Sequence, residues 1–311
     1  MAVIWAQLVI NGQKNGVHPF VVPIRDRTTM KTYPGVFIGD CGSKFGNHGI
    51  DNGFIGFKNY KIPFDNILDR VSGVDANGNF RAIENNLDKR HGLYMGPLSL
   101  GRSFITMNPV GSTFNALNIA LKYSCVRRQF EAPNKKEETL IIDYPLIRFR
   151  LMPLIAQAFI FYNVGSEIMK KYDHNSKELL KEKSKLVLEL HSISAAAKAR
   201  VSWFCLDTIG QCRHLLGGHG YSSYSRLGRL YFDHDVNTTW EGDNNMLLFQ
   251  SSKYVLKEMH RCRQKPNPYS ILNFVNEVRL YLSRTLSCLK HGPSKIFLIF
   301  KTTRKSMRED Y

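Results

Sequence analysis

Residues 177–216 read KELLKEKSKLVLELHSISAAAKARVSWFCLDTIGQCRHLL and repeat apolar side chains at the three- and four-residue spacing of an α-helix. Gly217 and Gly218 follow directly, and glycine is common just beyond a helix C-terminus. Three further segments have the same periodicity: residues 103–130, 144–172 and 243–261. Four long helices with short links predict an up-down helical bundle.

The predicted helices contain residues that interrupt helical hydrogen bonding. Pro109 and Gly111 are expected to bend or break the first helix early, and Pro153 to kink the second. Residues 219–242, between the third and fourth helices, are expected to form a short irregular stretch.

The chain before the helices has the composition of β-structure. Residues 2–10, AVIWAQLVI, precede the turn dipeptide Asn11-Gly12, and residues 17–24 and 52–63 are further strand candidates. We therefore expect an α+β protein: a partial antiparallel β-barrel or sandwich, then the bundle. The expected domains are residues 1–83 (β), 84–262 (bundle) and 263–311 (the start of a second helical domain).

Composition narrows the class of protein. The 311 residues are 43% hydrophobic and 22% charged, which provides a core and argues against disorder. The net charge of +17 favours anionic partners such as nucleic acid, acidic membranes or polyphosphate cofactors. No nucleic-acid-binding module is recognisable, so nucleic acid is not expected as a partner. There is no run of 18 apolar residues, so no transmembrane segment is expected.

Several common chemistries lack their motifs. The six cysteines are widely spaced without CxxC, and there is no HExxH, so we expect no metal site and reduced, intracellular thiols. Neither a dinucleotide-binding GxGxxG after a strand nor a P-loop is present, and the GxSxG elbow of hydrolases is missing.

Three segments could bear function, and each has a simpler structural explanation. Arg127-Arg128-Gln129-Phe130 is either a basic helix end or a clamp for a pyrophosphate. Gly217-Gly218-His219-Gly220 is either a helix cap or a site where backbone approaches a cofactor closely. Glu241, in the sequence Trp240 to Asn245, either helps a helix start, with Asp243 or Asn244 as its N-cap, or acts as a general base.

Taken together, these motifs and others resemble the acyl-CoA oxidases, a branch of the acyl-CoA dehydrogenase superfamily. The resemblance runs from about residue 2 to about residue 260 and includes PGVFIGDCGSKFGNHGIDNGFIGF, GPLSLGR, YSCVRRQF, CRHLLGGHGY and TTWEGDNNMLLFQ. GPLSLGR and EGDNN look most like the branched-chain, pristanoyl-type oxidases. Against the family pattern the chain looks truncated at both ends, lacking the first helical domain.

The resemblance implies roles for particular residues. Glu241 matches the catalytic carboxylate that removes the α-proton of an acyl-CoA thioester. Arg127 and Phe130 match residues that reach the FAD of a partner subunit, Gly217 and Gly218 match glycines against the FAD adenosine, and Asn245 matches a flavin-neighbouring position. Arg90 or Arg102 is expected to meet the phosphates of CoA.

The resemblance also implies an activity. It is the FAD-dependent conversion of acyl-CoA to trans-2-enoyl-CoA, with oxygen reduced to hydrogen peroxide, in fatty-acid β-oxidation. The family implies a homodimer and a peroxisomal location, although the C-terminus, REDY, is not a signal of the SKL type. The alternative is a catalytically inactive fragment or assembly partner that does not hold flavin.

Overall fold

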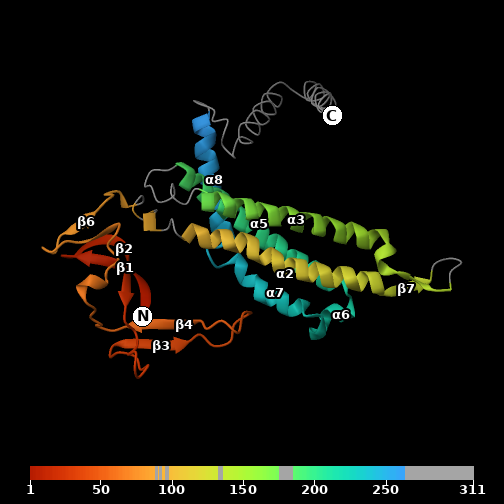
Figure 1. Cartoon of the computed structure of the whole chain (residues 1–311), viewed down its shortest axis with the longest axis horizontal. Helices are drawn as coiled ribbons and strands as arrows, with labels where there is room; N and C mark the ends of the chain where they lie inside the picture. Colours follow the sequence, from red (N-terminus) through yellow and green to blue (C-terminus); the bar gives the residue numbers. More distant parts are fainter. Residues whose placement is uncertain (88–89, 91–92, 95–97, 132–135, 175–184, 263–311) are drawn as a thin grey trace, which may run out of the picture. The chain divides into compact units, whose positions relative to one another are not determined.

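The computed structural model describes the chain except for residues 88–89, 91–92, 95–97, 132–135, 175–184 and 263–311 (Figure 1). Its contacts group the chain into two compact units, Met1–Asn245 and Met246–Tyr311. The helix expected within residues 263–311 lies outside the described residues. The domain boundaries expected at residues 83 and 262 stay predictions.

The N-terminal part is built from short antiparallel pairs of strands. β1 (Ala2–Ile10) pairs with β2 (Gln13–Val22) across a tight turn, where Asn11 and Gly12 have φ of 49° and 78°. Positive φ at both positions is what a two-residue hairpin turn requires, and Asn-Gly adopts it at low cost. The other pairs in this part are β3 (Val36–Asp40) with β4 (Gly53–Phe57) and β5 (Ser72–Val74) with β6 (Phe80–Ala82).

The expected barrel or sandwich is thus present only as separate hairpins. In the described part of the chain every sheet has two strands, and no sheet closes into a barrel. The α+β class itself is confirmed, because this β-structure is followed by long helices.

The helical part of the first unit is an up-down bundle. Its elements are α2 (Leu98–Val126), β7 (Arg128–Glu131), β8 (Glu138–Leu140), η2 (Ile141–Asp143), α3 (Pro145–His174), α5 (Lys185–Leu215), α6 (Gly218–Tyr221), η3 (Ser223–Ser225), α7 (Leu227–Asp235) and η4 (Val236–Thr238). In Figure 1, α2, α3 and α5 lie side by side along their lengths, and each pair is in contact.

The directions of the helices follow from which residues meet. Phe114 of α2 packs on Phe159 of α3, while Gly165 of α3 lies against Met107 of α2, so α3 runs antiparallel to α2. On α7, Tyr231 lies near Gly210 and His234 bonds to Ser202, so α7 runs antiparallel to α5. These pairings confirm the bundle.

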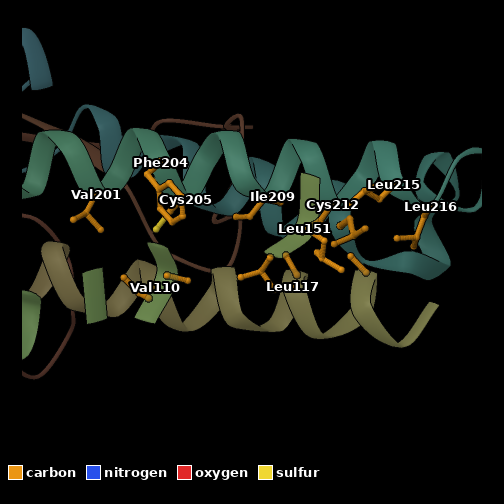
Figure 2. Close-up of a cluster of buried hydrophobic side chains, with 14 residues drawn as sticks. Val110, Leu117, Leu151, Val201, Phe204, Cys205, Ile209, Cys212, Leu215 and Leu216 are labelled. Atoms are coloured by element: carbon orange, nitrogen blue, oxygen red, sulfur yellow. The ribbon is translucent and has the colours of Figure 1, made fainter. Parts of the chain in front are cut away.

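The core lies between α2, α3 and α5. Figure 2 shows Val110 and Leu117 of α2 pointing toward Val201, Cys205 and the other labelled side chains of α5, with Leu151 of α3 beside them. All five of these named residues are at most 3% exposed. Burial of apolar surface at about 25 cal/mol per Å² is the main force that holds these helices together.

Two expectations about the helices were wrong, namely a break in the first helix at Pro109 and an irregular stretch at residues 219–242. α2 continues through Pro109 without a break. Pro109 is buried, and the hydroxyl of Thr113 donates to its carbonyl at 3.1 Å, so packing within the core outweighs the lost backbone hydrogen bond.

Residues 219–242, which were expected to be irregular, contain α7, whose Leu227 belongs to the core. The helix expected at residues 243–261 is α8 (Asn244–Cys262), which lies mostly in the second unit.

In the described part of the chain, α3 is the one helix long and apolar enough to cross a membrane by length and composition. This is weak evidence for a membrane span, because core helices of other proteins pass the same test. α3 contributes Leu151 and Ala158 to the core of the bundle. Arg148 and Arg150 near its start are consistent with the absence of an uninterrupted apolar run.

Candidate active site

Glu241 lies in a tight turn between η4 and α8. Its φ is 56° and that of Gly242 is 110°, so both residues have positive φ. This is uncommon for a residue with a side chain and costs of the order of 1–3 kcal/mol, so the surrounding structure must enforce it. Before the turn, the indole Nε1 of Trp240 donates to Oδ1 of Asn237 at 2.9 Å, which fixes the ring.

From one side the turn is contacted by the start of α2. A Cβ at Gly101 would lie 2.9 Å from Oε1 of Glu241, so the carboxylate rests against a residue that has no side chain. The next residue, Arg102, donates from Nε to the carbonyl oxygen of Glu241 at 3.0 Å and from Nη1 to Nδ1 of His191 at 3.1 Å. Burial lowers the pKa of the Arg102 guanidinium, and the negative charge of Glu241 opposes this effect.

From the other side the turn is held by α5. The ammonium of Lys198 donates to the carbonyl oxygen of Gly242 at 2.8 Å and to Oδ1 of Asn244 at 2.9 Å. The Asn244 amide in turn donates to Oγ of Ser202 at 2.9 Å. Asp243 is the N-cap of α8, because its Oδ1 accepts the backbone N–H of Asn245 at 3.0 Å. One of the two N-cap candidates is therefore correct.

Gly101, Lys198 and Asn244 were missed as site residues by reasoning from the sequence. Gly101 lies in GPLSLGR, but nothing in that motif indicates which side chain approaches it. For Lys198 a signal exists: it lies in SISAAAKARVS, and its helical neighbours Ala195, Val201 and Ser202 are buried. A lysine on a helix face made of small, buried residues needs hydrogen-bond acceptors for its charge. Its position therefore predicts that it bonds to another buried polar group.

Four of the five residues expected to bind the cofactor are at the other end of the bundle. Arg127 follows the last residue of α2, and Phe130 is in β7 with a φ of 58° and a 70% exposed side chain. Gly217 and Gly218 are exposed at the start of α6. A hydrogen bond of 3.1 Å between the Tyr123 hydroxyl and Nδ1 of His219 joins the end of α2 to α6.

The structure thus separates the predicted site residues into two groups. The first comprises Glu241 and Arg102, and the second Arg127, Phe130, Gly217 and Gly218. α2 is continuous, so at a rise of ~1.5 Å per residue Arg102 and Val126 are about 36 Å apart along its axis. Figure 1 shows β7 and α6 at the end of the bundle where α2 terminates, away from its start.

Two further predicted residues belong to neither group. Arg90 is 5% exposed and donates to the backbone carbonyls of Asn15 at 2.7 Å and Glu84 at 3.3 Å. Its guanidinium also lies 4.8 Å from the centre of the Phe80 ring, so it stabilises the β-structure, and its contact with CoA stays a prediction. Asn245 is exposed and follows Asn244 in the first turn of α8.

The described residues contain no group of three or more His, Cys, Asp or Glu side chains that could hold a metal ion. Among the described cysteines, Cys41 and Cys125 are exposed and free, while Cys205 and Cys212 are buried in the core. Burial raises the pKa of both core thiols to about 12, so they are not candidates for nucleophiles.

The chain has an acyl-CoA dehydrogenase-like fold, as do the solved acyl-CoA oxidase structures to which it is similar. The family model for the acyl-CoA oxidase C-alpha1 domain matches residues 95–256, which is more than half of the chain, so the chain belongs to the acyl-CoA oxidase family. The match includes both groups of site residues.

Individual relatives agree with this assignment. The peroxisomal acyl-coenzyme A oxidase 3 of Arabidopsis thaliana is 35% identical over 293 residues, which cover 92% of this chain and 42% of that protein. The structure of Arabidopsis thaliana acyl-CoA oxidase 1 is similar, with a TM-score of 0.80 and 32% identity over 88% of this chain and 41% of that one.

A second similar structure is acyl-CoA oxidase-1 of Caenorhabditis elegans in complex with FAD and ATP. Its TM-score is 0.72, with 33% identity over 86% of this chain and 39% of that one. The chain therefore spans about two fifths of the length of the relatives that it matches.

Proposed function

We propose that this protein is an FAD-dependent acyl-CoA oxidase of fatty-acid β-oxidation. The reaction converts an acyl-CoA thioester to trans-2-enoyl-CoA and reduces oxygen to hydrogen peroxide. The observation that carries the proposal is the arrangement of Glu241: an exposed carboxylate on a left-handed turn, with the two successive carbonyls of Glu241 and Gly242 held by cations from α2 and α5.

In this proposal Glu241 is the general base. Its carboxylate removes the α-proton of the thioester, a step that requires fixed geometry. The fixed turn supplies the geometry, and the ring of Trp240 beside it supplies apolar surface. The backbone N–H of Glu241 polarises the thioester carbonyl, because a donor fixed in advance stabilises the charge that develops there.

The second group of residues fits a flavin dinucleotide. Arg127 provides an exposed guanidinium that could bind phosphate, and Phe130 provides an exposed ring. Gly217 and Gly218 expose their backbone, with open space where a side chain would be. We assign these four residues, with Asn245, to FAD binding. When bound, FAD supplies the two-electron acceptor that takes the hydride from the β-carbon and passes the electrons to oxygen.

The separation of the two groups supports a homodimer. About 36 Å of α2 lies between them. We therefore assign Glu241 and Arg127 of one chain to two different flavins. A partner subunit then supplies Arg127, Phe130, Gly217 and Gly218, so that each flavin site uses both chains.

Further assignments rest on the relatives alone. We propose a peroxisomal location, because the Arabidopsis relative is named as peroxisomal. We also retain Arg90 and Arg102 as candidate ligands of the CoA phosphates, and residues 1–83, 84–262 and 263–311 as domains. Of the two arginines, Arg102 is the better candidate, since it lies at the turn that contains Glu241.

The test is flavin reduction by substrate. The purified protein is reconstituted with FAD, freed of unbound flavin, and mixed anaerobically with acyl-CoA thioesters while flavin absorbance is followed. Bleaching in the parent protein and its loss in Glu241→Gln, with flavin still bound, is the expected result. Glu167→Gln is the control, because that carboxylate is exposed on α3 and pairs only with Lys170 among the ion pairs described.

Two outcomes would contradict the proposal. If Glu241→Gln bleaches at the parental rate, Glu241 is not the base. If the folded protein retains no flavin, the alternative reading of an assembly partner without oxidase activity replaces it.

A further inference from the structure

Lys198 is the largest side chain that the bundle buries completely. It lies in α5 and is 0% exposed. An ammonium group taken out of water is costly unless hydrogen-bond acceptors replace the solvent. Its two acceptors, the carbonyl oxygen of Gly242 and Oδ1 of Asn244, both belong to the turn that contains Glu241. The buried charge is thus directed at one short segment.

The turn that contains Glu241 has a backbone conformation that is unfavourable without support from other residues. Glu241 has a positive φ, and such a conformation persists in a residue with a side chain only where neighbouring groups impose it. The carbonyl of Glu241 is fixed by Arg102 and the next carbonyl, that of Gly242, by Lys198. Side chains from two different helices, α2 and α5, therefore hold two consecutive carbonyl groups by hydrogen bonds. These bonds fix the backbone of the turn and so the direction of the Glu241 side chain.

The second acceptor of Lys198 is itself fixed by α5. The amide of Asn244 donates to Oγ of Ser202 at 2.9 Å and to the carbonyl of Ala199 at 3.3 Å. Asn244 is 1% exposed and begins α8. Lys198 therefore bonds to a side chain, Asn244, that α5 itself holds in place. Its second bond, to the carbonyl of Gly242, then fixes the turn relative to α5.

We propose that Lys198 is a positioning residue for Glu241: by bonding Gly242 and Asn244 it holds the left-handed turn that places the Glu241 carboxylate against Gly101. Lys198 does not touch substrate or cofactor in this role. The inference rests on the proposed function of Glu241 as the base, and adds a residue on which the geometry of that base depends.

The charge state of Lys198 agrees with such a role. Burial lowers its pKa to about 8, and the positive charge of Arg102 acts in the same direction, while Asp243 and Glu241 oppose the shift. A neutral amine keeps two N–H donors, which is the number of acceptors present. The turn therefore stays anchored whether or not Lys198 carries its proton.

The experiment compares Lys198→Met with Lys170→Met in the flavin-loaded protein. Methionine fills a similar volume without donors, so only the anchoring is lost. Lys170 lies on the exposed face of α3 and controls for removal of a lysine charge. Asn244→Leu is the second variant, because it removes one acceptor and leaves Lys198 in place. The readouts are flavin content, melting temperature, kcat and KM for flavin reduction, and hydrogen exchange of residues 239–246.

In Lys198→Met we expect kcat to fall about 100-fold, since a misplacement of ~1 Å costs about this much, with KM changed less than about threefold. Amide exchange should rise at least about tenfold in residues 239–246 and stay unchanged in residues 201–215. Asn244→Leu should show the same pattern more weakly, and Lys170→Met should match the parent.

Unchanged kcat and unchanged exchange in Lys198→Met would overturn the inference, as would faster exchange throughout the bundle, which marks a general structural role. If Lys198→Met does not fold, the same criteria apply to Asn244→Leu. Glu241→Gln separates this inference from the proposed function: if that variant reduces flavin normally, the function fails, whereas an inactive Glu241→Gln beside a fully active Lys198→Met refutes the positioning role alone.

Discussion

The carboxylate of Glu241 lies against Gly101, and a Cβ at Gly101 would be 2.9 Å from Oε1 and 3.2 Å from Cδ. Real Cβ atoms essentially never approach another heavy atom to 2.9 Å, so an added Cβ would require the carboxylate to move. The glycine therefore creates the space in which the carboxylate lies, although α2 as a helix has no local need for it. In helices glycine costs about 1 kcal/mol relative to alanine, so this space is maintained against helix propensity.

Gly101→Ala should displace the Glu241 carboxylate and slow flavin reduction about 10- to 100-fold, because the base leaves its position. The helix itself should not suffer, since alanine favours it. The matched control is Gly111→Ala on the same helix, where nothing lies within 4 Å of an added Cβ. That variant should keep full activity and gain up to about 1 kcal/mol of stability. Equal rates for the two variants in stopped-flow absorbance would contradict the expectation.

A mixture of two inactive variants should recover activity if each flavin site uses two chains. Glu241→Gln removes the proposed base and Arg127→Ala the proposed flavin contact, yet a mixed dimer would contain one site with both groups intact. After joint refolding, random pairing should give about a quarter of the parental activity. Peroxide production from acyl-CoA measures it. A mixture that stays inactive, although mixed dimers are detected, would show that one chain builds its whole site.

The stability of the protein should depend on Lys198 above neutral pH. Its pKa falls from the ordinary 10.5 to about 8 on folding, so between these values the unfolded state binds more protons. Stability conferred by Lys198 should therefore rise with pH through this window. We expect the melting temperature of the parent, minus that of Lys198→Met, to increase from pH 8 to pH 10. Lys170→Met should not show this increase, and a constant difference for Lys198→Met would contradict the buried charge.

Acid should destabilise the bundle through His234. This side chain is 3% exposed, and its ring Nε2 donates to the Ser202 carbonyl at 2.9 Å. Burial lowers the pKa of His234 below its ordinary value of 6.5. The stability that neutral His234 confers is therefore fully present above pH 6.5 and is lost as the pH falls through the folded-state pKa. The melting temperature should therefore fall as the pH is lowered below 6.5.

His234→Gln keeps a donor for Ser202 but does not titrate, so its melting temperature should vary less over the same range. Burial and the charge of Arg90 also lower the pKa of His18, so the His234→Gln variant will keep some acid sensitivity. A parent and a His234→Gln variant with identical pH profiles would show that His234 does not contribute.

The sequence by itself determined the fold class and the family of the protein, whereas the roles that it suggests for Glu241 and the cofactor-binding residues stay predictions. Helical periodicity predicted α2, α3, α5 and α8, and Asn11-Gly12 predicted the first hairpin, because both signals depend on residues close together in the chain. The turn with Glu241 was likewise identifiable from its own residues. α7 was missed because it is a nine-residue helix in a segment that reads as irregular.

Only the tertiary structure decided which of these residues meet. Gly101, Lys198 and Glu241 come from α2, α5 and the turn before α8, and no local pattern links segments so far apart. The same holds for the separation of Glu241 from Arg127: a helix that passes through Pro109 unbroken keeps them at opposite ends. Local sequence sets helix and turn propensities, whereas packing of the core fixes which helix faces meet, and those faces bring Gly101, Arg102 and Lys198 to the turn that contains Glu241.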